Sequence, residues 1–200
     1  MRTAPSGACD AIVIGASAGG IEVLAQLLPA LPRGVPLGVF IVLHQRRERS
    51  SQLVEVLRRR CRLELMEAAD KETVIPGVVY VAPADYHLLI EKGPQLALSA
   101  DEPVHLCRPS IDVLFESAAE IYGARLLGIV LSGANEDGAQ GLAAVSCRGG
   151  TAIVQDPQSA YADTMPRAAL RGVPGARALA VADIAAMLAA LGQASRAFTE

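Results

Sequence analysis

The stretch Ile12-Val13-Ile14-Gly15-Ala16-Ser17-Ala18-Gly19-Gly20 decides the fold, because an apolar run passes directly into a glycine-rich turn that carries a serine. Helix-spaced apolar residues follow, which predicts a helix from Gly20 to Leu31. A buried strand, a turn and a helix in this order form the repeating unit of a parallel sheet. Active sites of such sheets lie at the carboxyl ends of the strands, so Ser17 occupies a position where a site is expected.

Two further apolar runs lead into polar residues in the same way. Val39 to Leu43 ends at His44, and Leu126 to Leu131 passes through a glycine-containing loop to Asp137. Neighbouring parallel strands bring their carboxyl ends together, so the three polar side chains are expected at one edge of the sheet. A serine, a histidine and a carboxylate so placed predict nucleophilic acyl chemistry, with a general base and an acid that orients it.

The rest of the chain predicts one α/β domain over residues 1–200: a three-layer, doubly wound, mostly parallel sheet. Val78 to Val81 predicts another strand, and His87 to Glu91 with Gln95 to Ser99 predicts an antiparallel hairpin at one sheet edge. The other expected elements are helices at Ser51 to Arg60, Ser110 to Tyr122, Ala139 to Cys147, Pro166 to Leu170 and Asp183 to Leu191 (capped by Asp183), and a strand at Thr151 to Val154.

Composition excludes several classes of protein. A formal net charge of −3 provides no general electrostatic footprint for nucleic acid or an anionic membrane. The apolar runs are too short to span a bilayer, no export signal is evident, and four scattered cysteines fit a reducing cytoplasm. We expect a cytoplasmic protein without membrane insertion. The arginine runs are expected as solvated surface, with docking of an acidic partner as the alternative; they comprise Arg46, Arg47, Arg49, Arg58, Arg59, Arg60 and Arg62.

Each candidate residue also has a structural explanation. Ser17 lies in a G-x-S-x-G turn that exposes its hydroxyl beside helix amides, yet it could cap the helix or belong to a dinucleotide-binding turn. The second strand ends without the carboxylate that NAD requires, which leaves only an NADP site held by Arg46 and Arg47. His44 could be an ordinary surface histidine, and Asp137 could be a turn or cap residue. The weaker candidates are His87, His105, Asn135, Glu136 and Asp156.

The candidate residues occur in the chain order Ser, His, Asp, whereas the α/β-hydrolases have the order Ser, Asp, His, so that fold is not expected. At these residues the chain instead resembles the catalytic domain of the CheB family, the methylesterases of bacterial chemotaxis. The resemblance covers about residues 11 to 192. The matching segments are Ile14 to Gly20, His44, Val79 to Pro83, His87-Leu88, Arg108 to Phe115, Leu131 to Gly133, Asp137 to Ala139, Gly141, and Met165 to Ala169.

The resemblance implies a cofactor-free and metal-free serine hydrolase that removes methyl groups from γ-glutamyl methyl esters of chemoreceptors. Some members also deamidate glutamines. The partner implied is a methylated chemoreceptor or a related signalling protein. The implied roles are Ser17 as nucleophile, His44 as general base, Asp137 as orienting acid, Ala18 and Ala134 at the oxyanion pocket, and Arg108 in substrate binding.

The chain departs from the family pattern at several positions around this site. Ala18 replaces the usual Thr, Gln45 and Ala134 replace Met, and Cys107 stands where a histidine often precedes Arg108. These changes motivate an alternative, a non-catalytic binding module of the same fold. Family members typically carry an N-terminal receiver domain. This chain starts about ten residues before its first strand, so we expect a stand-alone form that is controlled otherwise.

Overall fold

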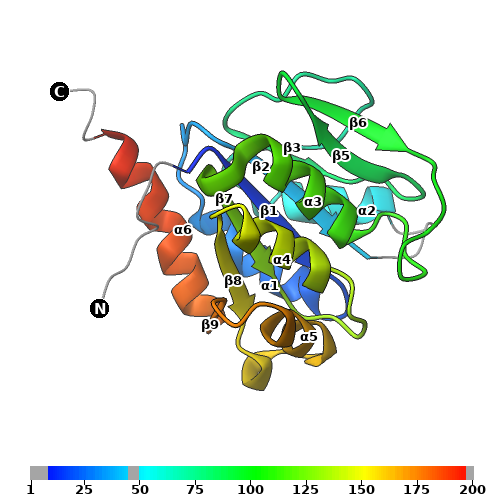
Figure 1. Cartoon of the computed structure of the whole chain (residues 1–200). Coiled ribbons are helices and arrows are strands. Elements are labelled where there is room, and N and C mark those ends of the chain that lie inside the picture. Colours follow the sequence, from blue (N-terminus) through cyan, green and yellow to red (C-terminus); the bar gives the residue numbers. More distant parts are fainter. Residues whose placement is uncertain (1–8, 45–49, 197–200) are drawn as a thin grey trace.

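The computed structural model describes residues 9–44 and 50–196, and its centre is a parallel sheet of seven strands (Figure 1). The strand order is β3-β4-β2-β1-β7-β8-β9, and every neighbouring pair is parallel. The strands are β1 (Ala11–Ala16), β2 (Gly38–Leu43), β3 (Glu64–Glu67), β4 (Val78–Val81), β7 (Leu126–Val130), β8 (Thr151–Gln155) and β9 (Arg177–Leu179).

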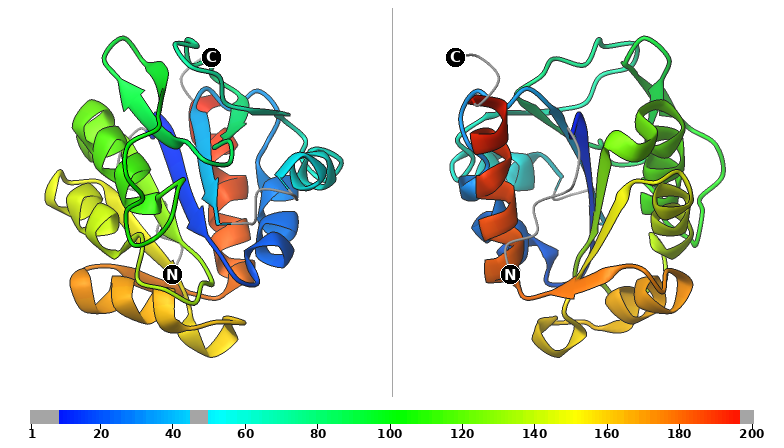
Figure 2. Two further views of the ribbon diagram at one scale, coloured as in Figure 1. Left: turned by 90° about the vertical axis from the view of Figure 1, so that its right-hand side faces the viewer. Right: turned by 60° about the vertical axis from the view of Figure 1, so that its left-hand side comes forward.

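Helices cover both faces of this sheet, which makes three layers (Figure 2). The helices are α1 (Gly20–Leu27), α2 (Ser50–Arg58), α3 (Ile111–Tyr122), α4 (Ala139–Cys147), α5 (Thr164–Gly172) and α6 (Val181–Arg196). Apolar side chains of α3, α4 and α5 share one core with Val13 of β1, and those of α1, α2 and α6 share the other with Ile12 and Ile14. Successive side chains of β1 therefore enter opposite cores, which explains its unbroken apolar sequence. The predicted doubly wound fold is confirmed.

The predicted hairpin is present, but it forms a sheet of its own. Strands β5 (His87–Glu91) and β6 (Gln95–Ser99) form a two-stranded antiparallel sheet, and Gln95 of β6 also forms a single antiparallel bridge with Thr73 (Figure 1). The hairpin packs on α3, where the Ser117 hydroxyl accepts a hydrogen bond from the backbone N–H of Ile90 at 3.2 Å. Its apolar residues fill the α3 core, so it does not extend the main sheet as we expected.

The remaining differences concern short or partly exposed segments. Strands β3 and β9 were not predicted, because β3 has four residues of mixed burial and β9 has three with two exposed. Helix α6 begins at Val181, so Asp183 lies in its first turn and does not cap it. Arg58 and Arg59 are exposed and both pair with Glu55, while Arg46, Arg47 and Arg49 lie outside the described residues. None of the described helices combines the length and apolarity needed to cross a bilayer.

Candidate active site

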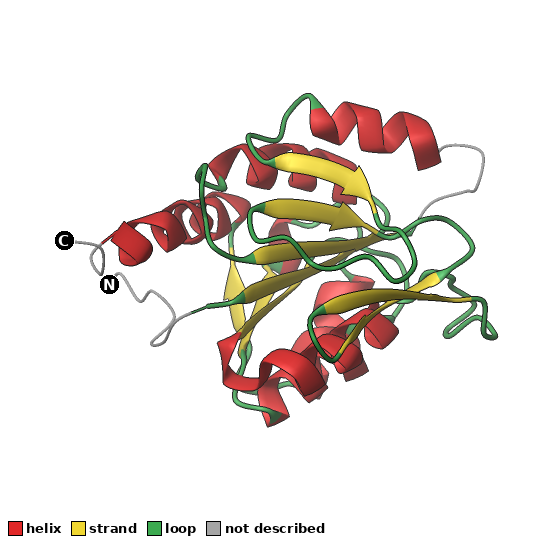
Figure 3. Cartoon of the chain, turned by 90° about the horizontal axis from the view of Figure 1, so that it is seen from above, coloured by secondary structure: helices red, strands yellow, loops and turns green. Residues whose placement is uncertain are grey.

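The arrows of the main sheet run in a common direction (Figure 3), so the carboxyl ends of the neighbouring parallel strands β1, β2 and β7 lie along one edge of the sheet. In the β1–β2 register Ala16 lies opposite Leu43, and the His44 backbone N–H donates to the Ala16 carbonyl at 3.0 Å. Ser17 directly follows Ala16, the last residue of β1. Its backbone N–H donates a hydrogen bond at 2.9 Å to the carbonyl of Ser132, which lies just after β7. Ser17 and His44 thus leave adjacent strands side by side.

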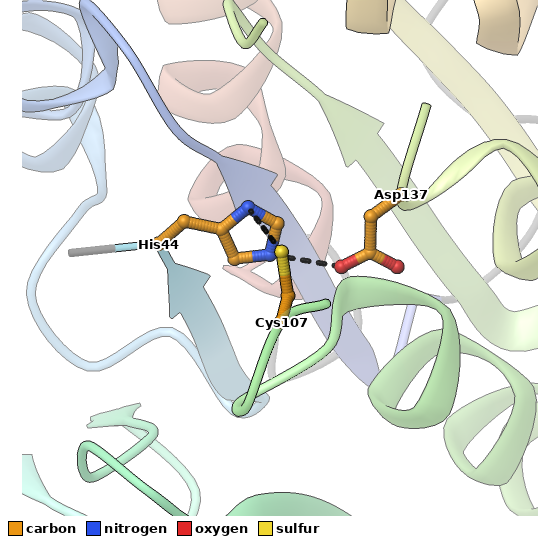
Figure 4. A group of neighbouring side chains, drawn as sticks. All are labelled: His44, Cys107 and Asp137. Atoms are coloured by element: carbon orange, nitrogen blue, oxygen red, sulfur yellow. Dashed lines mark hydrogen bonds and ion pairs between the residues drawn. The ribbon is translucent and has the colours of Figure 1, made fainter. Parts of the chain in front are cut away.

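His44 and Asp137 are joined by a direct hydrogen bond between their side chains. The distance from His44 Nε2 to Asp137 Oδ2 is 2.8 Å, and the two side chains are 10% and 0% exposed (Figure 4). The residues are 93 positions apart in the sequence, so only the sheet topology brings them together. This contact is the arrangement expected of a general base and the acid that orients it.

Both oxygens of the Asp137 carboxylate accept two hydrogen bonds each. Besides His44, Oδ2 accepts the backbone N–H of Ile111 at 2.7 Å, while Oδ1 accepts the Ser110 hydroxyl at 2.8 Å and the Asp112 N–H at 3.1 Å. Burial by itself raises the pKa of Asp137, but the hydrogen bonds from His44, Ile111 and Asp112 outweigh it and hold that pKa below its usual value. The group is therefore a buried carboxylate anion at neutral pH.

The imidazole of His44 is oriented by this anion. An acceptor-only carboxylate on Nε2 requires the proton on that nitrogen, which leaves Nδ1 for proton transfer. The usual triad uses the two nitrogens in the reverse order. Burial lowers the pKa of His44, but hydrogen bonding to Asp137 and Cys107 and the charges of those groups together raise it from 6.5 to about 9.

The structure does not join Ser17 to His44. Within the described residues the Ser17 hydroxyl has no hydrogen-bond partner, and Nδ1 of His44 instead faces Cys107 Sγ at 3.6 Å and Asn135 Nδ2 at 3.5 Å. Catalytic hydrogen bonds are often long or absent before substrate binds. The role of Ser17 therefore stays a prediction, supported by its place beside His44.

The turn after β1, where an oxyanion site is predicted, is tightly constrained. Gly19 has φ 78°, and a Cβ there would lie 2.5 Å from Tyr161 Cβ, so glycine is needed on both counts. The Ser132 hydroxyl donates to the Ala18 carbonyl at 2.7 Å and fixes the turn. Among described residues, the N–H groups of Ala18 and Ala134 find no acceptor, and their role in binding an oxyanion stays a prediction.

Arg108 uses part of its guanidinium within the protein. Its Nη1 donates to the carbonyls of Ala100 and Asp101 at 2.8 and 3.0 Å, which anchors the loop that leads into α3. A role in substrate binding stays a prediction for the rest of the group. Gln45, the other position of interest beside the site, lies outside the described residues.

Four of the weaker candidates have structural roles. His87 is buried between the Ser110 N–H and the Glu102 carbonyl, and Glu136 forms an exposed ion pair with Arg171 at 2.9 Å. Asp156 accepts the Gln158 N–H at 3.0 Å and caps a short 3₁₀ turn, Pro157–Ser159. His105 lies 3.3 Å from Asp112.

Sequence reasoning missed that Cys107 and Asn135 contact the base. Asn135 Nδ2 donates to Cys107 Sγ at 3.2 Å, so the two residues and His44 Nδ1 form a compact group. The available signals were the replacement of the usual histidine by Cys107, and the position of Asn135 in the loop after β7.

Comparison with known proteins agrees with this geometry. Residues 12–188 match the family model described as CheB methylesterase. The chain belongs to the CheB methylesterase family. The crystal structure of the Thermotoga maritima CheB methylesterase catalytic domain superimposes with a TM-score of 0.86 at 30% identity, covering 92% of this chain and 100% of that one.

Curated relatives within the CheB family carry consistent names. A protein of Carboxydothermus hydrogenoformans named protein-glutamate methylesterase/protein-glutamine glutaminase 1 is 39% identical over 90% of this chain and 54% of its own length. A Leptospira interrogans protein whose name assigns the same activities provisionally is 44% identical over 92% of this chain and 95% of its own. Membership of this family favours the esterase hypothesis over both the NADP site and the non-catalytic module.

Proposed function

We propose that this protein is a serine esterase that hydrolyses γ-glutamyl methyl esters on a chemoreceptor or a related signalling protein. The observation that carries the proposal is the buried pair of His44 and Asp137 at the strand end beside the Ser17 turn. The pair supplies an oriented base, and the glycine-rich turn supplies a hydroxyl and free amides within the same edge of the sheet.

The chemistry proceeds in two matched halves. The Ser17 hydroxyl oxygen attacks the ester carbonyl carbon while His44 Nδ1 takes its proton, and the amides of Ala18 and Ala134 receive the oxyanion. Collapse breaks the bond to the methoxy group, which leaves as methanol with the proton from His44. Water then attacks the acyl-enzyme in the same manner and releases glutamate and free Ser17. A glutamine side chain would follow the same course, with ammonia as the first product.

Methanol release from a methylated chemoreceptor cytoplasmic fragment tests this proposal. Removing the nucleophile of a serine hydrolase lowers turnover by about 10⁴-fold or more, so we expect Ser17→Ala to be inactive with an unchanged melting temperature. Ser159→Ala, which alters an exposed serine outside the site, serves as the matched control and should keep full activity. Undiminished release by Ser17→Ala would rule out Ser17 as the nucleophile.

The non-catalytic alternative predicts a different result in the same assay. The fragment would bind with no methanol released by the parent protein or by either variant. Ammonia release from the unmodified glutamine form of the fragment, measured in parallel, decides whether amides are accepted as well as esters.

A further inference from the structure

The two most exposed large apolar residues in the described part of the chain both lie next to the candidate active site. Leu106 is 98% exposed and Tyr161 is 85% exposed, whereas every other large apolar residue described is at most 55% exposed. The esterase chemistry uses neither side chain. Exposed apolar side chains beside a site mark a surface that binds another molecule, so we asked what these two could contact.

Leu106 is held outward by a tight turn beside the candidate base. Val104 and Cys107 exchange backbone hydrogen bonds of 3.1 and 2.8 Å, and the two residues between them, His105 and Leu106, have φ 51° and 61°. These are the features of a type I′ turn, which favours glycine and asparagine and strains a leucine. Leu106 thus stands at the tip of the turn, one residue before Cys107, which lies beside the His44 ring (Figure 4).

This turn is anchored to the protein on both sides of Leu106. The ring of His105 lies 3.3 Å from the buried carboxylate of Asp112, and Cys107 Sγ accepts a hydrogen bond from the Asn135 amide at 3.2 Å. A side chain carried on a fixed turn requires little further ordering when a partner covers it, which favours its use as a binding contact.

Tyr161 occupies another flank of the site, against the turn that carries Ser17. A Cβ added at Gly19 would lie 2.5 Å from Tyr161 Cβ, so the base of the tyrosine packs on this turn while most of the residue stays exposed. The adjoining backbone is fixed, because the Ala162 N–H donates at 2.9 Å to the Ser132 hydroxyl, which itself donates to the turn. One exposed apolar residue therefore lies beside the base and one beside the nucleophile turn.

The strands at this edge limit the form of the segment that can bind. Strands β1, β2 and β7 each have a neighbour on both sides, so they offer no free backbone edge to an extended peptide. A helix needs no such edge, and it binds through apolar side chains spaced one turn apart. Because residues three or four positions apart lie about 5–6 Å from each other on a helix surface, apolar residues one turn before and after a glutamyl ester lie beside it.

We propose that Leu106 and Tyr161 are specificity-determining residues that contact a substrate helix on either side of its methylated glutamate, through apolar side chains one helical turn from the ester. The inference rests on the proposed function, since the ester must reach Ser17. It assigns recognition of the protein substrate to two residues that take no part in the chemistry. A methylated glutamate without apolar neighbours on its helix is then a poor substrate.

Kinetics with two substrates test these contacts. The methylated chemoreceptor fragment carries the flanking residues, whereas N-acetylglutamate γ-methyl ester has the ester alone. Leu106→Asn removes the apolar side chain and suits the positive φ of the turn, and Tyr161→Ala retains the Cβ that packs on Gly19. We expect each variant to raise KM for the fragment about tenfold with kcat within about twofold, so that kcat/KM falls for the fragment relative to the small ester.

Two comparisons make this test specific. Ile75→Asn changes an exposed apolar residue just before β4, at the opposite edge of the sheet, and should match the parent. Serine in place of the apolar residues one turn from the methylated glutamate of the fragment should raise KM for the parent. The same change should add nothing for the double variant Leu106→Asn/Tyr161→Ala, because its contacts are already lost.

An unchanged KM for the fragment in both variants, or an equal loss of kcat/KM with both substrates, would overturn the proposal. So would a parent that sediments as a dimer and dissociates on Leu106→Asn, because the surface would then belong to a second copy of the chain. A parent that releases methanol from neither substrate would disprove the proposed function instead. The Kd of the fragment, measured by calorimetry, would still decide the contacts: about tenfold weaker binding by the variants supports them, and equal or absent binding overturns them.

Discussion

At the scale of single residues, Asp137 performs two functions with one carboxylate. It orients His44 through Oδ2, and it accepts the N–H groups of Ile111 and Asp112 at the start of α3. These helix amides stabilise the negative charge, because the N-terminus of a helix carries unpaired N–H groups and partial positive charge. The structural explanation of Asp137 as a cap residue is therefore confirmed, although the helix that it caps is not the one that follows it, and its catalytic role stays a prediction.

Asp137→Asn separates the two functions. The amide retains an oxygen for the α3 amides but cannot hold the imidazolium that forms in the reaction, and it favours the wrong tautomer. We expect methanol release to fall by roughly 10³–10⁴-fold. The free energy of unfolding should fall by about 1–3 kcal/mol in urea titration, since a buried charged hydrogen bond is weakened. Glu136→Gln, at the exposed neighbouring position, should change stability by less than about 0.5 kcal/mol and leave turnover intact.

At the scale of elements, α3 and α4 cap each other. Asp137, just before α4, accepts from the start of α3, and Asp112, in the first turn of α3, accepts the Gly138 and Gly141 N–H groups at 2.9 and 2.6 Å. Burial raises the pKa of Asp112 to about 6, opposed by the hydrogen bond from Gly141. The exchange of caps fixes the position of Asp137 relative to the sheet, and hence that of His44.

Gly141 allows this close approach, because a Cβ there would lie 2.6 Å from Phe115 Cβ and 2.9 Å from Asp112 Cα. Alanine is the better helix former by about 1 kcal/mol, yet we expect Gly141→Ala to destabilise the protein by about 1–3 kcal/mol. Turnover should fall as well, since the two helices must separate. Gly175→Ala, at an exposed turn with open space around it, is the control and should be nearly neutral. Equal stability of the two variants would contradict the close contact.

At the scale of the whole molecule, two apolar cores pack on either side of one sheet. Tyr122, the last residue of α3, is 8% exposed beside the core that contains Phe40 and Phe115. Burial raises the pKa of its phenol from 10 to about 12, because the phenolate is poorly solvated there. The folded state therefore keeps a proton that the unfolded chain loses above pH 10.

This linkage predicts an alkaline loss of stability. The contribution of Tyr122 is complete below pH 10 and disappears as the pH rises from 10 to about 12, on the order of 2 kcal/mol in total. Urea titrations between pH 9 and 12 should show a shallower decline for Tyr122→Phe, which has no phenol to ionise. If the free energy of unfolding fell equally with pH in the parent and in Tyr122→Phe, the Tyr122 phenol would not be a cause of the alkaline loss of stability. Tyr161→Phe, at an exposed tyrosine, should follow the parent.

The sequence by itself determined the alternation of strands and helices, since buried strands and amphipathic helices have different apolar periods. It also placed Ser17, His44 and Asp137 at strand ends, and motif spacing predicted the family. Short or half-exposed strands such as β3 and β9 carry too few apolar residues for a periodic signal, so they were missed.

Only the tertiary structure decided which atoms meet. It set the pairing of His44 Nε2 with Asp137, the mutual capping of α3 and α4, and the separation of the hairpin from the main sheet. It also brought Cys107 and Asn135 to Nδ1 of His44, from segments 63 and 91 residues away. Contacts of this kind depend on strand order and side-chain direction, which local periodicity does not encode.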